Sequence, residues 1–406
     1  MMAGGKVLIR DRVFYENLVP GAEYAVRGRV MLKPLGDEEA LELEAAMVDE
    51  NGKEEEERIF TPKERDGSVD VYFEVDSEEL RGRSIVVFET VEYIVREPES
   101  RVLLFAHEDI ADEEQTIHFP DGETTALDSD TGGHTANADE DVKIIDEVRY
   151  INLIPGKTYT VTGTLMDKET GSPVTAGGKP VTVSQEFVPG SADGSVTVVF
   201  EFDASLIEGR SVTAFEKVTS CGKEVFVHED IEDKEQSIDF PWIRTSAEDM
   251  ADGDKEIAAE GTVQIKDTVT YRNLTPGTKY RLSGVLMDKA SGKPAVSEGR
   301  EITGETVFTA SEKSGKAYVT FRLNSADLKD GEYVVFETLF EKAPETGVEK
   351  VVGTHQDTED KAQTIRRKTR TGTATGDGNH TVLWIAVLAA ASACAAGIIL
   401  QRRNRI

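Results

Sequence analysis

The chain has 406 residues, 38% of them hydrophobic and 30% charged, which suits roughly two to four folded domains and argues against a wholly disordered protein. The sequence holds 46 Lys and Arg against 77 Asp and Glu, so the formal net charge is −31, and such a surface repels phosphate backbones and excludes nucleic-acid binding. The two cysteines, Cys221 and Cys394, provide neither a disulfide framework nor a metal-ligand spacing.

The N-terminal segment runs directly into an alternating strand pattern and contains no apolar stretch of signal-peptide length. Three blocks of similar sequence follow, opening with RDRVFYENLVPGAEY from Arg10, IDEVRYINLIPGKTY from Ile145 and KDTVTYRNLTPGTKY from Lys266. Each opening predicts an alternating strand, a tight Asn-Leu-x-Pro-Gly turn and a second strand that begins at the tyrosine.

Later in each block comes a strand with a Phe-Glu pair, and each block closes on a His-x-Asp-x-x-Asp-x-x-Gln motif. The closing glutamines are 121 and 127 residues apart, which is the length of a domain rather than of a solenoid repeat. The strands are short and alternate apolar with polar residues, and no helical stripe precedes residue 382. We therefore predict an all-β fold of tandem immunoglobulin-like antiparallel β-sandwich domains, with repeats at 1–119, 120–241 and 242–366.

Residues that can carry chemistry recur in one register. Each block has an aspartate in its opening strand, a glutamate in the Phe-Glu pair, and a histidine eight residues before the closing glutamine. In the second and third blocks a threonine lies 22 residues before the aspartate. The set is Asp11, Glu89, His107 and Gln115 in block one, Thr124, Asp146, Glu216, His228 and Gln236 in block two, and Thr245, Asp267, Glu337, His355 and Gln363 in block three.

A hydroxyl, an imidazole and carboxylates are the components of nucleophilic acyl transfer, and a glutamine carboxamide is a group that can be attacked. Eight residues of extended strand would separate His and Gln by about 26 Å, so the acidic segment between them has to loop if the two side chains are to meet. Two other interpretations of these residues remain open. The residues could form only a buried hydrogen-bond network, or the acidic loop, or the segment starting at Asp128, could bind calcium.

The blocks resemble the VaFE repeats of Gram-positive surface proteins, whose domains are similar to the Thr-Gln ester-bond domains of clostridial adhesins. The resemblance rests on Asp-x-Val-x-Tyr-x-Asn-Leu, the Val-x-Phe-Glu strand and the closing histidine-to-glutamine motif. It implies a self-formed ester between Thr124 and Gln236 in block two and between Thr245 and Gln363 in block three, with loss of ammonia, no cofactor and no outside substrate.

The resemblance also implies a role for each remaining site residue. The histidines would accept the threonine proton, the glutamates would orient or charge-balance the histidines, and the aspartates would polarise the amide or stabilise the oxyanion. Block one keeps its aspartate, glutamate, histidine and glutamine, but no threonine precedes Asp11. We expect its first strand to be missing through truncation of the sequence at the N-terminus, and its cross-link to stay open.

Residues 382–400 are 19 positions without a charge, long enough for a transmembrane helix, and Arg402, Arg403 and Arg405 follow in a basic cytoplasmic tail at 401–406. The repeats would then lie outside the cell. The linker at 367–381 resembles a degenerate sortase signal, with Thr371-Gly372 and Thr375-Gly376 as candidate sites but without the usual Leu-Pro. It implies a sortase and peptidoglycan as partners, with plain membrane anchoring as the alternative.

We interpret the protein as an exported shaft anchored at its C-terminus. One alternative is a ligand-binding adhesin, and another is a pilin subunit joined to its neighbours. A Lys-Asn isopeptide bond is the rival cross-link, but the recurring asparagines belong to the Pro-Gly turn and no lysine occupies one register in all three blocks.

Overall fold

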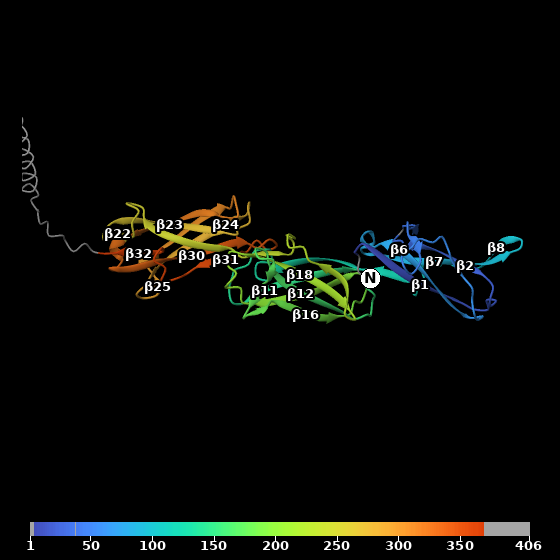
Figure 1. Ribbon diagram of the computed structural model, residues 1–406. Helices are drawn as coiled ribbons and strands as arrows, with labels where there is room; N and C mark the ends of the chain where they lie inside the picture. The colour runs from blue at the N-terminus through green and yellow to red at the C-terminus, as the bar shows by residue number, and fades with distance from the viewer. Residues whose placement is uncertain (1–3, 37, 369–406) are drawn as a thin grey trace, which may run out of the picture.

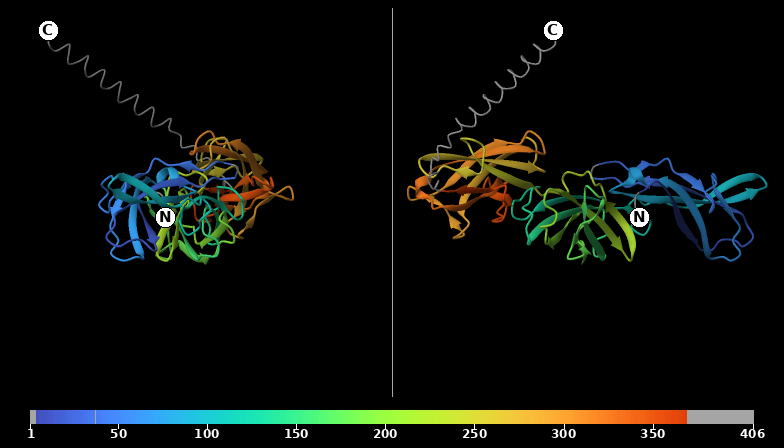
Figure 2. Two further views of the ribbon diagram at one scale, coloured as in Figure 1. Left: turned by 90° about the vertical axis from the view of Figure 1, so that its right-hand side faces the viewer. Right: turned by 60° about the vertical axis from the view of Figure 1, so that its left-hand side comes forward.

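Strands that bury every second residue make up most of the structure, as the alternating sequence pattern predicts. In β12 (Tyr159–Asp167), for example, each inward-facing residue is buried and each intervening one is partly exposed. The computed structural model describes residues 4–36 and 38–368, which form three β domains arranged end to end (Figures 1 and 2). The all-β prediction is confirmed.

Domain 1 covers residues 4–36 and 38–119 and forms two sheets, ordered β1-β6-β4 and β3-β2-β7-β8. In the second sheet β5 also pairs with β2, and β9 with β7. Its elements are β1 (Lys6–Tyr15), β2 (Tyr24–Leu32), β3 (Leu41–Glu42), β4 (Ala46–Val48), β5 (Arg58–Phe60), β6 (Gly67–Asp76), the 3-10 helix η1 (Glu78–Leu80), β7 (Arg83–Arg96), β8 (Glu99–His107) and β9 (Thr116–Phe119).

Domain 2 covers residues 120–241, with sheets ordered β10-β11-β17 and β13-β12-β18-β19; in the second, β16 pairs with β12 and β20 with β18. Its strands are β10 (Asp121–Asp128), β11 (Val142–Ile151), β12, β13 (Ser172–Pro173), β14 (Thr175–Ala176), β15 (Lys179–Pro180), β16 (Thr182–Phe187), β17 (Gly194–Phe202), β18 (Ser211–Ser220), β19 (Lys223–His228) and β20 (Ser237–Asp239).

Domain 3 covers residues 242–368, with sheets ordered β21-β23-β29 and β22-β32-β30-β24-β25; in the second, β28 pairs with β24 and β31 with β30. Its elements are β21 (Trp242–Asp249), β22 (Glu256–Ile257), β23 (Thr262–Arg272), β24 (Lys279–Asp288), β25 (Lys293–Pro294), β26 (Val296–Ser297), β27 (Arg300–Glu301), β28 (Thr303–Thr309), β29 (Gly315–Asn324), the 3-10 helix η2 (Ser325–Asp327), β30 (Gly331–Lys342), β31 (Glu349–His355) and β32 (Thr364–Arg367).

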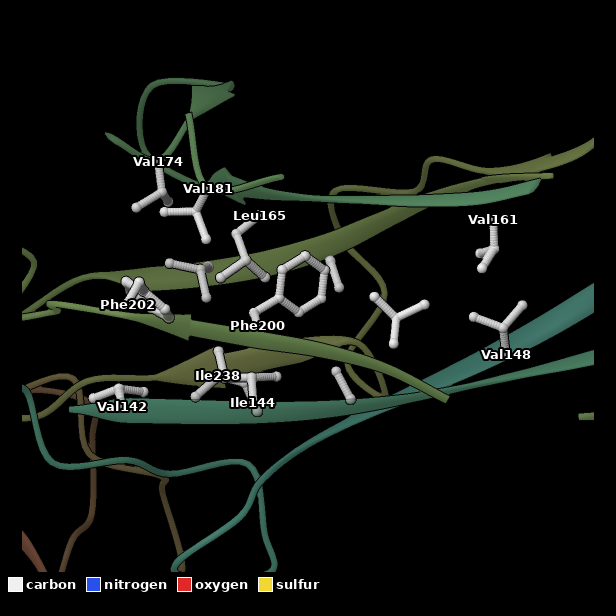
Figure 3. Packing of buried hydrophobic residues seen from close by; sticks show 14 of the residues in the cluster. Val142, Ile144, Val148, Val161, Leu165, Val174, Val181, Phe200, Phe202 and Ile238 are labelled. Atoms are coloured by element: carbon white, nitrogen blue, oxygen red, sulfur yellow. The ribbon is translucent and has the colours of Figure 1, made fainter. Parts of the chain in front are cut away.

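Each domain has its own hydrophobic core between its two sheets. In domain 2, side chains of β11, β12, β17 and β20 converge around the Phe200 ring (Figure 3). Phe200, Ile144, Leu165 and Ile238 are fully buried there. Because the two faces of each strand alternate, the same pattern that fills the core also sends a small set of polar side chains inward.

The first strand distinguishes domain 1 from the other two. In domains 2 and 3 the opening strand pairs on both edges, so β11 lies between β10 and β17, and β23 lies between β21 and β29. In domain 1, within residues 4–36 and 38–119, the equivalent β1 pairs only with β6 and has no strand on its other edge. Leu8 and Phe14 lie on the outward face of this strand and are exposed, at 46% and 75%.

The sequence-predicted transmembrane span at 382–400 lies outside the described residues, as does the linker with its Thr-Gly pairs from Thr371 on. Within residues 4–36 and 38–368, no helix has the length and apolar character needed to cross a membrane.

A glycine sits opposite the Phe-Glu glutamate in every domain. The facing pairs are Gly28 and Glu89, Gly163 and Glu216, and Gly284 and Glu337. A Cβ on Gly163 would lie 2.6 Å from the Phe200 ring, and on Gly284 it would lie 2.3 Å from a Glu337 carboxyl oxygen. The missing side chain therefore leaves the space that the core phenylalanine and the buried glutamate fill.

We expect Gly163→Ala to destabilise domain 2 by about 1–3 kcal/mol, because the added methyl has to displace a packed ring. Gly190→Ala is the matched control, since nothing lies within 4 Å of its added Cβ. The urea midpoint of domain 2 in each variant is measured by pulsed hydrogen exchange during urea unfolding, with mass spectrometry of domain 2 peptides. Equal urea midpoints for the two variants would contradict the packing argument.

Candidate functional site

The first strand of domain 2 carries the candidate nucleophile to the interior. Thr124 and Ala126 point inward from β10, and Ala126 pairs with Asp146 of β11. The Ala126 amide also donates to the Glu235 carbonyl at 2.9 Å, so the strand contacts the segment that holds Gln236. In domain 3 the Ala247 amide donates to the Ala362 carbonyl at 3.0 Å in the same way.

The closing glutamine is fixed by its own backbone. The Gln236 carbonyl accepts from the Ala214 amide of β18 at 3.1 Å, and the Gln363 carbonyl accepts from the Val335 amide of β30 at 3.2 Å. Both glutamines are fully buried. Each therefore lies between the first strand and the strand with the Phe-Glu pair.

In domain 2 the threonine, the glutamine and the glutamate meet at one atom. The Thr124 hydroxyl donates to Glu216 Oε2 at 3.1 Å, and Gln236 Nε2 donates to the same oxygen at 2.5 Å. Thr124 is 5% exposed and Glu216 1% exposed, so the cluster is shielded from water. The predicted pair Thr124 and Gln236 is thus brought together, although 112 positions separate the two residues.

In domain 3 the two partners contact each other directly. Gln363 Nε2 donates to Thr245 Oγ1 at 2.5 Å. Asp267 and Glu337 are fully buried beside them. The carboxamide carbon is bonded to that nitrogen, so the threonine oxygen lies within reach of the atom it would attack.

The two carboxyl groups of each site are buried together, which sets their protonation. Burial, followed by the charge of Asp146, raises the pKa of Glu216 to about 10, whereas burial raises the pKa of Asp146 only to about 6, because a hydrogen bond from Glu216 opposes the shift. In domain 3 burial and Asp267 raise the pKa of Glu337 well above its usual value, and burial raises that of Asp267 to about 6. At neutral pH the domain 2 pair therefore holds one proton, on the glutamate, and the shifts in domain 3 have the same direction.

Each histidine contacts an aspartate five residues further along the chain. The Nε2-to-carboxylate distances are 3.0 Å for His107 and Asp112, 2.8 Å for His228 and Asp233, and 3.4 Å for His355 and Asp360. Sequence reasoning did not assign these aspartates a role, although each is the second aspartate of the closing motif. It gave the orienting role to the glutamates, whose hydrogen bonds among the described residues go to Thr124 and Gln236 in domain 2 instead.

The acidic segment between histidine and glutamine loops as predicted. In domain 2 a turn at Asp230–Asp233 brings His228 back onto Asp233 and ends where Gln236 enters the core. His228 also lies close enough to Asp146 for its charge to lower the pKa of that aspartate. In domain 3 burial, then the charge of Arg244, lowers the pKa of His355.

Domain 1 has the same groups in an open setting. Gln115 Nε2 donates to Glu89 Oε2 at 3.1 Å, and burial, then Asp11, raises the pKa of Glu89 to about 10. A groove of about 610 Å³ runs past Asp11, Glu89, His107 and Gln115. The His107 side chain is 46% exposed, against 23% for His228 and 8% for His355, because no threonine-bearing strand among the described residues of domain 1 covers the site.

The calcium hypotheses gain no support from the geometry. Residues 4–36 and 38–368 contain no group of three or more His, Cys, Asp or Glu side chains arranged to hold a metal ion. Asp128 instead accepts a hydrogen bond from the Thr131 amide at 2.8 Å and shapes its own turn.

Comparison with known proteins gives a family. A family model described as a T-Q ester bond containing domain matches residues 1–119, 122–240 and 241–367. No curated protein matches the chain significantly.

Similar solved structures include an adhesin from Mobiluncus mulieris with intramolecular disulfide, isopeptide and ester bond cross-links. It is 12% identical over 54% of this chain and 80% of its own, with a TM-score of 0.28. The C-terminal domain of the AgI/II polypeptide BspA from Streptococcus agalactiae is 10% identical over 58% of this chain and 98% of its own, with a TM-score of 0.28. The C-terminal domain of the antigen I/II-family protein AspA from Streptococcus pyogenes is 9% identical over 61% of this chain and 100% of its own, with a TM-score of 0.29.

The protonation of the buried pair predicts a pH dependence. Between the unfolded pKa of Glu216, near 4.5, and its folded pKa of about 10, the folded state retains a proton that the unfolded state releases. The free energy of unfolding should therefore fall as pH rises through this window, by at most about 1.4 kcal/mol per pH unit for one proton. Asp146 contributes a further decrease in the free energy of unfolding as the pH rises from 3.8 to about 6.

We expect Glu216→Gln, which stays neutral, to flatten this decline. The comparison is made in a Thr124→Ala background, by the peptide-resolved urea unfolding described above at pH 5 and pH 8. Exchange of the exposed Glu186 for glutamine is the matched control. An unchanged slope in Glu216→Gln would show that the glutamate does not hold the proton.

Proposed function

Since the chain belongs to the family of T-Q ester bond containing domains, we propose that domain 2 is closed by an ester between Thr124 and Gln236, and domain 3 by an ester between Thr245 and Gln363. The observation that carries the proposal is the direct contact of Gln363 Nε2 with Thr245 Oγ1 in a buried site. The two carboxyl groups of each domain are buried beside the candidate bond, and the histidine of each domain pairs in register with the glutamate.

The proposed reaction is one acyl transfer in each domain. The threonine oxygen attacks the glutamine carboxamide carbon, the C–N bond breaks, and the threonine proton ultimately leaves on the ammonia. The products are one ester and one ammonia, so neither an oxidant nor a cofactor is needed. The protein acts on itself in a single turnover and is not an enzyme for outside substrates.

The histidine is proposed as the base. Asp233 accepts from His228 Nε2, which fixes the tautomer and leaves the other ring nitrogen able to take a proton. In the resting arrangement the Thr124 hydrogen points to Glu216, so it has to swing toward the imidazole before the attack. The neutral glutamate keeps the amide in place, and the aspartate beside it supplies the only negative charge of the pair.

The ester would stabilise each domain by restricting the unfolded chain. Thr245 and Gln363 are 118 positions apart. In the chain-entropy account, closing a loop of that length is comparable to a long-range disulfide, about 4–5 kcal/mol. Domains without disulfides gain this constraint with no dependence on redox conditions.

We further propose that the domains, read as immunoglobulin-like sandwiches, form the shaft of a cell-surface adhesin or pilus-like protein. Residues 382–400 would anchor it in the membrane, and Thr371-Gly372 or Thr375-Gly376 would serve a sortase that attaches it to peptidoglycan. The sequence pattern at the C-terminus supports this part of the proposal.

A second candidate role for the polar set is a plain hydrogen-bond network. Domain 1 favours it there, because Asp11, Glu89 and Gln115 keep their arrangement although no threonine faces them.

The intact mass of the full chain tests the proposal. Two esters predict a loss of about 34 Da, one ammonia from each of domains 2 and 3. Thr124→Ala or Thr245→Ala should each leave a loss of about 17 Da, and the double variant none. Gln115→Ala should leave the full loss, because domain 1 has no partner for that glutamine. An unmodified wild-type mass in folded protein would reduce the site to the hydrogen-bond network.

The histidine–aspartate pair has its own test. Asp233→Asn should slow ester formation in domain 2 by about 10²-fold or more, because the imidazole loses the partner that fixes its tautomer. The rate is followed as the loss of ammonia in newly refolded protein, separately for peptides of each domain. Domain 3 of the same molecule is the internal control, and equal rates in the variant and the wild type would remove the aspartate from the mechanism.

A further inference from the structure

The Asn-Leu-x-Pro-Gly turn is built identically in all three domains. Its asparagine has a left-handed backbone, with φ of 62°, 64° and 60° at Asn17, Asn152 and Asn273. Two residues further on, the backbone amide donates to the hydroxyl of the tyrosine that starts the next strand, at 2.9 to 3.0 Å in each case. The turn itself therefore requires a residue that tolerates positive φ, which glycine would also satisfy.

The side chain of the asparagine contacts a different domain. At the joint between domains 1 and 2, Asn152 Nδ2 donates to the Arg83 carbonyl at 2.6 Å. Its Oδ1 accepts from the Ser84 hydroxyl at 3.0 Å and lies 2.9 Å from His118 Nδ1. All three partners belong to domain 1, at the start of β7 and on β9.

The joint between domains 2 and 3 repeats this arrangement. Asn273 Nδ2 donates to the Arg210 carbonyl at 2.7 Å, and Asn273 Oδ1 lies 3.2 Å from the Ser211 hydroxyl, which also donates to Asp239, the residue in the place of His118. Ser211 holds the same position in β18 that Ser84 holds in β7, five residues before the buried glutamate. Asn273 is 9% exposed, so the carboxamide is enclosed by the preceding domain.

Asn17 shows the same turn, but among the described residues its side chain makes no hydrogen bond to domain 2 or domain 3. It is exposed, and its side-chain hydrogen bond is a long one, 3.4 Å from Arg65 of its own domain. The enclosed carboxamides at the two joints are therefore a property of domain contact rather than of the turn.

We propose that Asn152 and Asn273 are docking residues that lock each domain onto the end of the one before it. The receiving socket consists of a serine hydroxyl and the carbonyl of the preceding arginine. This inference concerns contacts between domains and does not depend on the ester bonds within them.

The socket is present on only one kind of domain end. In domain 3 the residue in register with Ser84 and Ser211 is Glu332, which forms a 2.6 Å ion pair with Arg366. The residue before it is Gly331 rather than an arginine. The C-terminal ends of domains 1 and 2 can therefore each bind the asparagine of a following domain. The same end of domain 3 carries an ion pair in place of the socket, so the arrangement of the domains is not symmetric.

Two ion pairs also connect domains 2 and 3. Arg244 of domain 3 forms a bidentate pair with Glu208 of domain 2, at 3.1 and 2.9 Å. Lys350 of β31 forms a 2.8 Å ion pair with Asp130 of domain 2. Each additional contact restricts movement at the joint, and the three domains lie in one row (Figures 1 and 2).

Distances between spin labels on neighbouring domains test the proposal in the full chain, with Cys221 and Cys394 replaced by serine. Cysteines for labelling at Ser68 and Glu186 span the first joint, and at Glu186 and Lys316 the second; all three positions are exposed. The parent protein should give one narrow distance distribution for each pair. Asn273→Gly keeps the turn but removes the carboxamide, so it should broaden the distribution across the second joint and leave the first unchanged.

Asn152→Gly should do the reverse, and Asn17→Gly, the matched control, should change neither distribution. Ser211→Glu, which introduces the residue that domain 3 has at this position, should broaden the second joint without unfolding domain 2. The intact mass of every variant records its esters independently. Narrow distributions retained in both joint variants, or broadening by Asn17→Gly, would overturn the proposal.

Discussion

Two carboxyl groups can be buried side by side only if at most one of them is charged, and the domains are arranged around that constraint. In domain 2, burial and the charge of Asp146 raise the pKa of Glu216 to about 10, so the glutamate takes the proton, whereas the pKa of Asp146 rises only to about 6. A glycine opposite the glutamate leaves the room for it. In domains 2 and 3 the first strand then covers the pair with a threonine, and the closing loop brings in a glutamine, so that a hydroxyl and a carboxamide are buried together.

The degree of cover differs among the domains. Domain 1 keeps the carboxyl pair but leaves its histidine half in solvent, because no strand of the described part of the chain lies on the outer edge of β1. In domain 2 the histidine side chain is 23% exposed, and in domain 3 it is only 8% exposed. There Lys255 Nζ donates to the Ala362 carbonyl at 2.5 Å and to that of Ala247, which ties the first strand to the glutamine segment. His134 holds this position in domain 2, so the two covered sites are not electrostatically equal.

Much of this arrangement could be predicted from the sequence, because a repeat reveals which residues keep a fixed register. Alternation predicted the strands, and the shared register of Thr124, Asp146 and Gln236 predicted that distant segments meet. The partner of His228 could not be predicted in this way, since Asp233 lies in an acidic run in which every residue looks equally solvated. Gly163 has its role only through the ring that approaches it, and Asn152 acts on another domain, which a pattern within one repeat does not reveal.

The path of the chain through domain 2 also decides how the domain responds to tension. The chain enters at β10, beside domain 1, and leaves through β20 toward domain 3; Thr124 of β10 and Gln236, the residue before β20, both hydrogen-bond to Glu216 Oε2. With those side chains joined, a pulling force would cross from one strand to the other within a few residues and bypass the rest of the sandwich. The roughly 110 residues in between, which could release about 350–400 Å of length if drawn out, would carry almost no load. The hydrophobic core would then serve to shelter the bond rather than to bear the strain.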